Sequence, residues 1–279
     1  MRRTLTTLAA AAAATLVLAG CGASGADEEV GSDDGGITTL TVGVSPVPHG
    51  EILEFVRDNL AEDAGLDLEI VSYDDYALPN RALVDGELDA NYFQHLPYYD
   101  SEVESQGYEL AHFPGVHIEP FALYSNTVTD VADLPDGATI GINNDPSNQG
   151  RALDLLAQAD LLTLDDSVDV VSATVADIVD NPHNFEFIEA DAASLARTLD
   201  DVDASVINGN YAIEAGLSPT TDGLLVEAGA DNPYANFLAV RAGDETNEAL
   251  VALNDLLHSE ETRQFIADTW SDGSVIAVD

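Results

Sequence analysis

Short apolar strands alternate with amphipathic helices along this chain, and this alternation restricts the fold more than any other feature. Residues 40–44 have the length and apolar content of a buried strand, and residues 48–64 place apolar side chains on one helical face. Further strands are expected at 66–71, 88–92 and 116–124, and helices at 80–84 and 96–106. Alternating strands and helices predict βαβ units and a parallel sheet covered by helices.

A second unit of the same kind follows from about residue 138. Its expected strands are 138–142, 185–189 and 204–207, and its expected helices follow Asp145 and span 192–199 and 212–215. An extended segment begins again near Asn236, and two helices, at 245–257 and 260–269, end the chain. Two similar α/β units with polar residues at their strand-to-helix turns predict a ligand cleft between them.

The N-terminal segment is predicted to direct export and anchoring. Two arginines precede a short alanine-rich apolar run that ends at Leu18-Ala19-Gly20-Cys21, so we expect residues 1–20 to be a secretory signal, too short to span a bilayer. The ending resembles a lipobox, which implies cleavage before Cys21 and lipid attachment to its sulfur. Cys21 is the only cysteine, so no disulfide can form within one chain. Residues 21–37 are expected to form a flexible tether, because Gly, Ser, Asp and Glu dominate them.

Acidic residues dominate the charge of the chain. There are 52 acidic residues against 8 basic ones, all arginine, and the formal net charge of −44 becomes −46 when Arg2 and Arg3 leave with the signal. Phosphate binding needs clustered cations, so the composition excludes nucleic acid as a partner. An apolar content of 46% nevertheless predicts a globular protein with an acidic coat.

The dispersed acids and the absence of lysine suggest a salt-adapted organism, because salt screens repulsion between like charges. We therefore expect the melting temperature of the mature protein to rise between low and molar salt. A melting temperature that stays constant over this range would contradict the hypothesis.

Arg151 is a rare cation in an unusual place. It follows the loop Asn143-Asn144-Asp145-Pro146-Ser147-Asn148-Gln149-Gly150, in which Asp145 and Pro146 have the residue types of a helix N-cap and first position. A helical side chain leans towards the N-terminus, so its charge would add to the positive end of the helix dipole. This arrangement favours a carboxylate or phosphate ligand. The alternative is an arginine that pairs with one of the many acidic side chains.

Four polar and aromatic patterns occur where strands are expected to end. They are Tyr92-Phe93-Gln94-His95, the loop before Arg151, Asn208-Gly209-Asn210-Tyr211 and Asn232-Pro233-Tyr234-Ala235-Asn236. Asparagine amides both donate and accept hydrogen bonds, arginine binds a carboxylate in bidentate fashion, and aromatic rings form an apolar slot. A zwitterion with an apolar side chain would use all three.

Read together, these segments resemble the methionine-binding lipoproteins of ABC importers, the MetQ or NlpA family. The resemblance covers nearly all of the mature chain. It rests on these patterns and on three further segments, Val44-Ser45-Pro46-Val47-Pro48-His49, Asp85-Gly86-Glu87-Leu88-Asp89-Ala90-Asn91 and Gly115-Val116-His117-Ile118-Glu119-Pro120.

The resemblance implies a type II periplasmic-binding-protein fold, with two α/β lobes and a ligand cleft between them. The strands that join the lobes would cross near Tyr124 and near Asn236. Lobe 1 would then comprise residues 38–124 and 237–279, and lobe 2 would comprise residues 125–236.

The resemblance also implies roles around a bound amino acid. Arg151 would pair with the carboxylate, and Asn208 and Asn236 would hydrogen-bond the carboxylate or the ammonium. Aromatic and imidazole groups would enclose the thioether, where sulfur–aromatic contacts are favourable. These groups are Tyr76, Tyr92, Phe93 and His95, with Tyr234 on the same wall.

The function so implied is that of a lipid-anchored receptor on the extracytoplasmic face of the cell membrane. It would capture methionine, either the L form alone or both the L and D forms, and deliver it to an ABC permease driven by an ATPase. No enzymatic activity, cofactor or metal is expected. Another small amino acid or a methionine-containing peptide remains open as the ligand, since pockets of this kind discriminate by only about 1–3 kcal/mol per methylene.

Three other functions compete with this interpretation. A metal receptor could use nitrogen and oxygen ligands, but their spacing fits no dense metal motif and leaves Arg151 without a task. An enzyme is disfavoured because the expected fold lacks a cysteine nucleophile, a Gly-x-Ser-x-Gly elbow and a phosphate loop. A structural lipoprotein would need no cleft in which a cation faces amides. The candidate metal ligands are His49, His95, His112, His117, Asp89 and Glu119.

Overall fold

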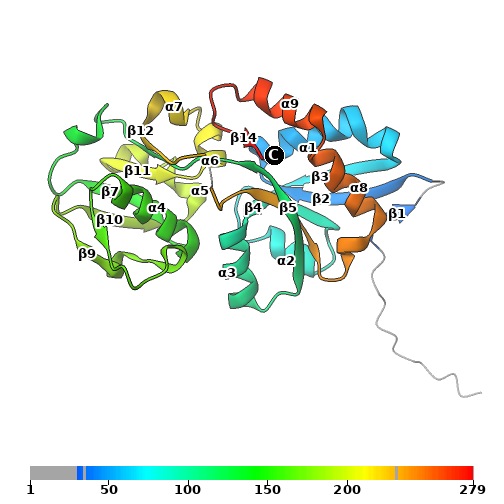
Figure 1. Cartoon of the computed structure of the whole chain (residues 1–279), viewed down its shortest axis with the longest axis horizontal. Coiled ribbons are helices and arrows are strands. Elements are labelled where there is room, and N and C mark those ends of the chain that lie inside the picture. The colour runs from blue at the N-terminus through cyan, green and yellow to red at the C-terminus, as the bar shows by residue number, and fades with distance from the viewer. Residues whose placement is uncertain (1–29, 34–35, 230–231, 279) are drawn as a thin grey trace, which may run out of the picture.

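The chain forms two α/β lobes that lie side by side (Figure 1). The computed structural model describes residues 30–33, 36–229 and 232–278. The expected signal and Cys21 lie outside these residues. No helix within the described ranges is long and apolar enough to cross a bilayer.

The first lobe is built on a sheet whose strands follow the order β1-β2-β4-β13-β5-β14, with β3 on the other edge of β2. Strands β2, β3 and β4 are parallel, as the βαβ pattern predicts. The strands are β1 (Ser32–Asp33), β2 (Thr38–Val44), β3 (Leu66–Ser72), β4 (Ala90–His95), β5 (Leu110–Ile118), β13 (Asn236–Arg241) and β14 (Ile276–Ala277).

Helices surround this sheet at the expected places. The predicted helix at 48–64 is present: Val47 has an extended backbone, and a helical run follows it to Ala64, with α1 (Glu51–Val56) in its middle and Ile52, Leu53 and Val56 in the core. Burial of such a side chain contributes about 1.5–3 kcal/mol. The other helices are α2 (Pro79–Val84), α3 (Leu96–Gln106), α8 (Glu248–Leu257) and α9 (Glu260–Thr269).

The second lobe contains a sheet in the order β10-β7-β11-β6-β12 and a small β8-β9 pair. Its strands are β6 (Ala122–Tyr124), β7 (Thr139–Asn143), β8 (Thr163–Leu164), β9 (Ile178–Asp180), β10 (Glu186–Ala190), β11 (Ala204–Ile207) and β12 (Gly223–Val226). Its helices are α4 (Pro146–Gln158), α5 (Ala192–Leu195), α6 (Gly209–Glu214) and α7 (Pro219–Asp222).

Both sheets are mixed, although the alternation pattern predicts parallel ones. The segment β13 runs antiparallel to β4 and β5, and β6 runs antiparallel to β11 and β12. These two strands adjoin the segments that connect the lobes. A strand that arrives from the other lobe enters the sheet from the opposite end, which a pattern of local periodicity does not reveal.

The chain passes from the first sheet to the second between Ile118 and Ala122, and returns between Val226 and Asn236. We call these connections the first and second crossing segments. Strand β6 already pairs with the second sheet, although the expected boundary assigned residues 122–124 to lobe 1.

Part of the expected tether also joins the first sheet. Strand β1 pairs antiparallel with Thr38 and Thr39 of β2. The Gly31 N–H donates to Asp89 Oδ1 over 2.9 Å, and Val30 contacts the core of lobe 1. A hydrogen-bonded edge and one apolar contact therefore order residues whose composition alone predicts a flexible chain.

Candidate ligand-binding site

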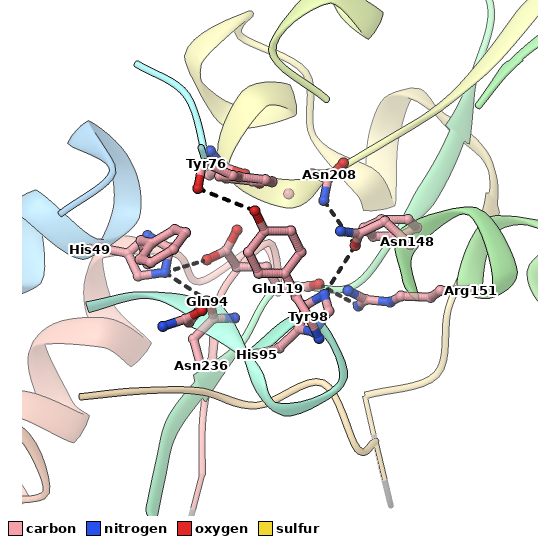
Figure 2. A pocket seen from close by; sticks show the side chains of 14 residues that line it. His49, Tyr76, Gln94, His95, Tyr98, Glu119, Asn148, Arg151, Asn208 and Asn236 are labelled. Atoms are coloured by element: carbon pink, nitrogen blue, oxygen red, sulfur yellow. Dashed lines mark hydrogen bonds and ion pairs between the residues drawn. The ribbon is translucent and has the colours of Figure 1, made fainter. Parts of the chain in front are cut away.

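A cavity lies between the lobes, where strands of both sheets end. Interfaces between domains are a common place for small-molecule sites. Figure 2 shows side chains from both lobes converging on it. The lining residues are His49, Tyr76, Phe93, Gln94, His95, Tyr98, Glu119, Phe121, Asn148, Arg151, Asn208, Gly209, Asn210 and Asn236.

Arg151 lines this cavity and is already paired with an acidic side chain. Its Nε and Nη2 donate to Glu227 Oε1 and Oε2 over 2.9 and 2.5 Å, and Nη2 also donates to the Glu119 carbonyl oxygen over 3.0 Å. Within the ranges that the structure describes, no acceptor bonds to Nη1. Nη1 can therefore bind a ligand while Glu227 neutralises the guanidinium. Arg151 therefore pairs with an acidic side chain, which was one of the two alternatives from the sequence, and it also faces the cavity.

Both crossing segments hold the Arg151 guanidinium. Phe121 and Glu119 belong to the first segment, and Glu227 and Tyr234 belong to the second. The guanidinium carbon lies 3.9 Å from the centre of the Phe121 ring and 4.0 Å from that of Tyr234. Stacking between two rings adds cation–π attraction to the ion pair and fixes the plane of the guanidinium.

Helix α4 places Arg151 as its sequence predicts. Asp145 caps the helix by accepting from the Asn148 N–H over 3.0 Å, and Pro146 is its first residue. A Cβ on Gly150 would lie 1.8 Å from the Val170 carbonyl oxygen. Glycine at this position therefore lets α4 approach the 170–172 turn closely.

Burial and pairing act in opposite directions on Glu227. Burial raises the pKa of its carboxyl, but the charge and hydrogen bonds of Arg151 lower it, and the net pKa lies below its usual value. Glu227 is therefore ionised at neutral pH and compensates Arg151.

An amide network occupies the lobe 2 side of the cavity. Asn148 Oδ1 accepts from Asn208 Nδ2 over 3.2 Å and from His95 Nε2 over 3.0 Å, so it joins the lobes. Asn143 Nδ2 donates to Asn208 Oδ1 over 2.8 Å. His95 Nδ1 accepts from the Tyr98 N–H, so the proton of this imidazole is on Nε2.

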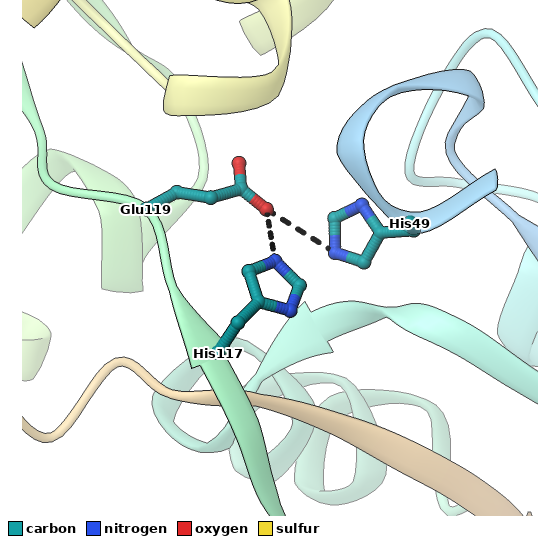
Figure 3. Close-up of side chains that lie close together, drawn as sticks. All are labelled: His49, His117 and Glu119. Atoms are coloured by element: carbon teal, nitrogen blue, oxygen red, sulfur yellow. Dashed lines mark hydrogen bonds and ion pairs between the residues drawn. The ribbon is translucent and has the colours of Figure 1, made fainter. Parts of the chain in front are cut away.

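His49, His117 and Glu119 form a buried cluster at the opposite side (Figure 3). His117 Nε2 donates to Glu119 Oε1 over 2.8 Å, and His49 Nε2 lies 3.3 Å from the same oxygen. The hydroxyl of Tyr92 makes a short hydrogen bond with His117 Nδ1. A chain of contacts thus runs from the core of lobe 1 to a carboxylate that lines the cavity.

Burial controls the protonation of this cluster. It lowers the pKa of His49 to about 4 and that of His117 to about 3, so both imidazoles are neutral at pH 7. Burial also raises the pKa of Glu119, although His49, Arg151 and the Asn210 N–H act against this shift. The cluster therefore favours a cationic ligand group, which would stabilise the Glu119 carboxylate.

Aromatic rings form the remaining wall. The Tyr76 ring centre lies 5.9 Å from that of Phe93, 5.7 Å from that of Tyr98 and 5.3 Å from that of Tyr211. Tyr76 also donates from its hydroxyl to Asn210 Oδ1 in the other lobe over 2.6 Å. Tyr76 therefore provides apolar surface and closes the cavity across the lobes.

Six of the eight expected ligand residues line the cavity: Tyr76, Phe93, His95, Arg151, Asn208 and Asn236. The other two do not, so their expected contact with a thioether needs correction. Tyr92 is fully buried in the core of lobe 1 and contacts His117. Tyr234 lies behind the cavity, against the Arg151 guanidinium and the His95 ring.

Several lining residues have no ligand role predicted from the sequence. Glu119 is expected there only as a candidate metal ligand, although it lies in the family-like segment that ends Ile118-Glu119-Pro120. Asn148 and Asn210 lie in loops that follow strands, but nothing in those loops separates an inward-facing amide from an ordinary turn residue. Of the six candidate metal ligands, the structure brings together His49, His117 and Glu119.

Comparison with known proteins identifies the family. The sequence profile of the NlpA lipoprotein family matches residues 40–278. The chain belongs to the NlpA lipoprotein family. Among the NlpA proteins, the methionine-binding lipoprotein MetQ of Bacillus subtilis is 41% identical over 265 residues, which are 94% of each chain. The D-methionine-binding lipoprotein MetQ of Escherichia coli is 34% identical over 94% of this chain and 93% of its own.

Solved structures of NlpA relatives show the same fold. A nutrient-binding protein from Burkholderia cenocepacia, bound to methionine, is 40% identical with a TM-score of 0.83, and the match covers 86% of this chain and all of that one. A methionine-binding lipoprotein from Bacillus subtilis gives the same TM-score at 41% identity, with 86% and 98% covered. The two-lobed α/β fold is thereby confirmed.

Proposed function

We propose that this protein is the substrate-binding lipoprotein of an ABC importer and that it captures methionine between its lobes. One observation carries the proposal: a cation, a carboxylate and an aromatic wall converge on one cavity. Arg151, Glu119 and the Tyr76–Phe93 pair supply these three features. They match the carboxylate, ammonium and thioether of one zwitterion. The methionine bound to the Burkholderia cenocepacia relative supports the same ligand.

The ligand carboxylate lies at Arg151 Nη1, with the amide of Asn208 beside it. The ammonium lies at Glu119, where Asn236 Oδ1 is also close, since both accept from His49 Nε2. The charges of Arg151 and Glu227 cancel and both imidazoles are neutral, so an ionised Glu119 leaves the site with one excess negative charge. A bound zwitterion then places its ammonium next to Glu119 and its carboxylate next to Arg151, so each of its charges meets a charge of opposite sign.

The thioether lies against Tyr76, Phe93, His95 and Tyr98. Tyr76 and Tyr98 also line a second cavity, which adjoins the first. Ligands therefore enter past these two rings, and the contact between Tyr76 and Asn210 closes behind them.

Capture follows from hinge closure around the two crossing segments. The closed form then delivers methionine to an ABC permease driven by an ATPase. A lipid on Cys21 anchors the receptor at the extracytoplasmic face of the membrane, and the protein acts as a carrier without catalysing a reaction.

A thermal-shift screen of amino acids in molar salt tests this function. The mature protein is unfolded, dialysed and refolded first, so that no ligand from the cell remains. A ligand at a hundred times its dissociation constant adds about 2.7 kcal/mol of stability, and we expect L-methionine to give one of the largest shifts. Stabilisation by another amino acid or a methionine-containing peptide, but not by methionine, would reassign the ligand. Stabilisation by none would contradict a receptor function.

A further inference from the structure

The cluster of His49, His117 and Glu119 has the composition of a metal site. Each residue offers one ligand atom, and the three atoms lie within 4.8 Å of one another. All three residues are buried, with exposed fractions of 1%, 0% and 6%. Two imidazoles and one carboxylate are the ligand set of many open zinc sites, in which the fourth position is left for another group.

We propose that these three side chains bind a borderline divalent cation such as Zn²⁺, and that this cation competes with the amino-acid ligand for Glu119. The competition follows from position, because His49 and Glu119 line the cavity whereas His117 lies behind them. A cation held by the cluster has its open coordination position towards the cavity.

Two of the three interatomic distances are close to those around a tetrahedral ion. Ligand atoms about 2.0–2.1 Å from zinc are separated by roughly 3.3–3.4 Å in a tetrahedron. Glu119 Oε1 lies 3.3 Å from His49 Nε2 and 2.8 Å from His117 Nε2. On binding, the second distance has to open slightly, and the nitrogens of the two imidazoles, which belong to a cluster 4.8 Å across, have to approach each other.

The charge of the site also favours a cation. Among the described residues, only the two neutral imidazoles lie within ion-pair distance of the Glu119 carboxylate. Arg151 is close, but Glu227 compensates it through two hydrogen bonds. A divalent cation would compensate the buried carboxylate, as the ligand ammonium does in the proposed function.

The protons are conserved when the cation binds. Each imidazole moves its proton from Nε2 to Nδ1, and each Nε2 lone pair binds the metal. In His117 the Nδ1 proton can then be donated to the Tyr92 hydroxyl oxygen, which already contacts that nitrogen. Such contacts behind a metal-binding histidine typically strengthen metal affinity about 10- to 100-fold.

Zinc titration of the refolded mature protein, with a large excess of Mg²⁺ to occupy surface acids, tests the proposal. We expect one Zn²⁺ per chain. His117→Gln should abolish this binding, and Tyr92→Phe should weaken it about 10-fold or more. The matched control is His112→Gln, since His112 lies on the same strand but is exposed and outside the cluster. It should bind zinc as the wild type does.

Competition in the wild-type protein tests the shared carboxylate and needs no variant to fold. Saturating methionine should prevent zinc binding, and zinc should weaken methionine binding in proportion to its concentration. Independent binding of the two, wild-type zinc affinity in His117→Gln, or no stoichiometric zinc at all would overturn the proposal. The zinc titration without amino acid does not depend on methionine binding. Failure of the zinc proposal is therefore distinguishable from failure of the proposed receptor function.

Discussion

Arg151→Ala is expected to weaken methionine binding by about 3–5 kcal/mol, because a desolvated carboxylate loses its charged partner. This corresponds to an increase in the dissociation constant of about a hundred-fold to several thousand-fold. The loss is large because the guanidinium has three tasks at once. It faces the ligand, pairs with Glu227 and fills the space between Phe121 and Tyr234. Calorimetric titration of the refolded variant measures the effect.

The matched control for this prediction is Arg57→Ala. Arg57 pairs with Asp58 over 2.7 Å at the surface, with 37% of its side chain exposed, and exposed pairs contribute about 0–1 kcal/mol. The control should bind methionine as tightly as the wild type. Wild-type affinity in a folded Arg151→Ala protein would refute the role of Arg151 in carboxylate recognition.

Glu119→Gln is expected to weaken methionine binding by about 1.5–3 kcal/mol, the usual contribution of a hydrogen bond to a charged group. The variant keeps the size of the side chain and an oxygen that can accept from His117. It removes the charge that pairs with the ligand ammonium. Glu186→Gln, at an exposed position on β10, is the matched control and should leave affinity unchanged.

The pH dependence of methionine binding shows whether the negative charge of Glu119, rather than the size of its side chain, is needed. Burial raises the pKa of this carboxyl in the empty receptor, and an ammonium nearby favours the ionised form. Wild-type affinity should therefore be constant above the raised pKa and should fall as the pH decreases through it. Glu119→Gln should show no such fall. Parallel pH profiles for both proteins would rule out ionised Glu119 as the ammonium partner.

Local patterns predict helices well where capping residues mark their ends. The expected helices 96–106 and 260–269 have the observed bounds of α3 and α9, because His95 and Ser259 cap their first turns. Short strands such as β12 and β14 were missed. Each pairs over only a few residues, so its extended state depends on tertiary neighbours rather than on its own sequence.

The site is predictable only where residue type is informative. Arg151 stands out because cations are rare here, and the asparagines stand out because they follow strands. Acidic residues carry no such signal in a chain with 52 of them, so neither Glu227 nor the ligand role of Glu119 could be recognised before their burial was known. Tyr92 was misplaced because a strand sequence does not say which face meets the core.

The composition of the chain allows one direct test of the central claim. Met1 is the only methionine, and it lies in the predicted signal. Crystals of the refolded mature protein with L-selenomethionine would therefore contain selenium only in the ligand. The account predicts one anomalous peak per chain, between the rings of Tyr76, Phe93 and Tyr98. A peak outside the cavity, or none at saturating ligand, would contradict it.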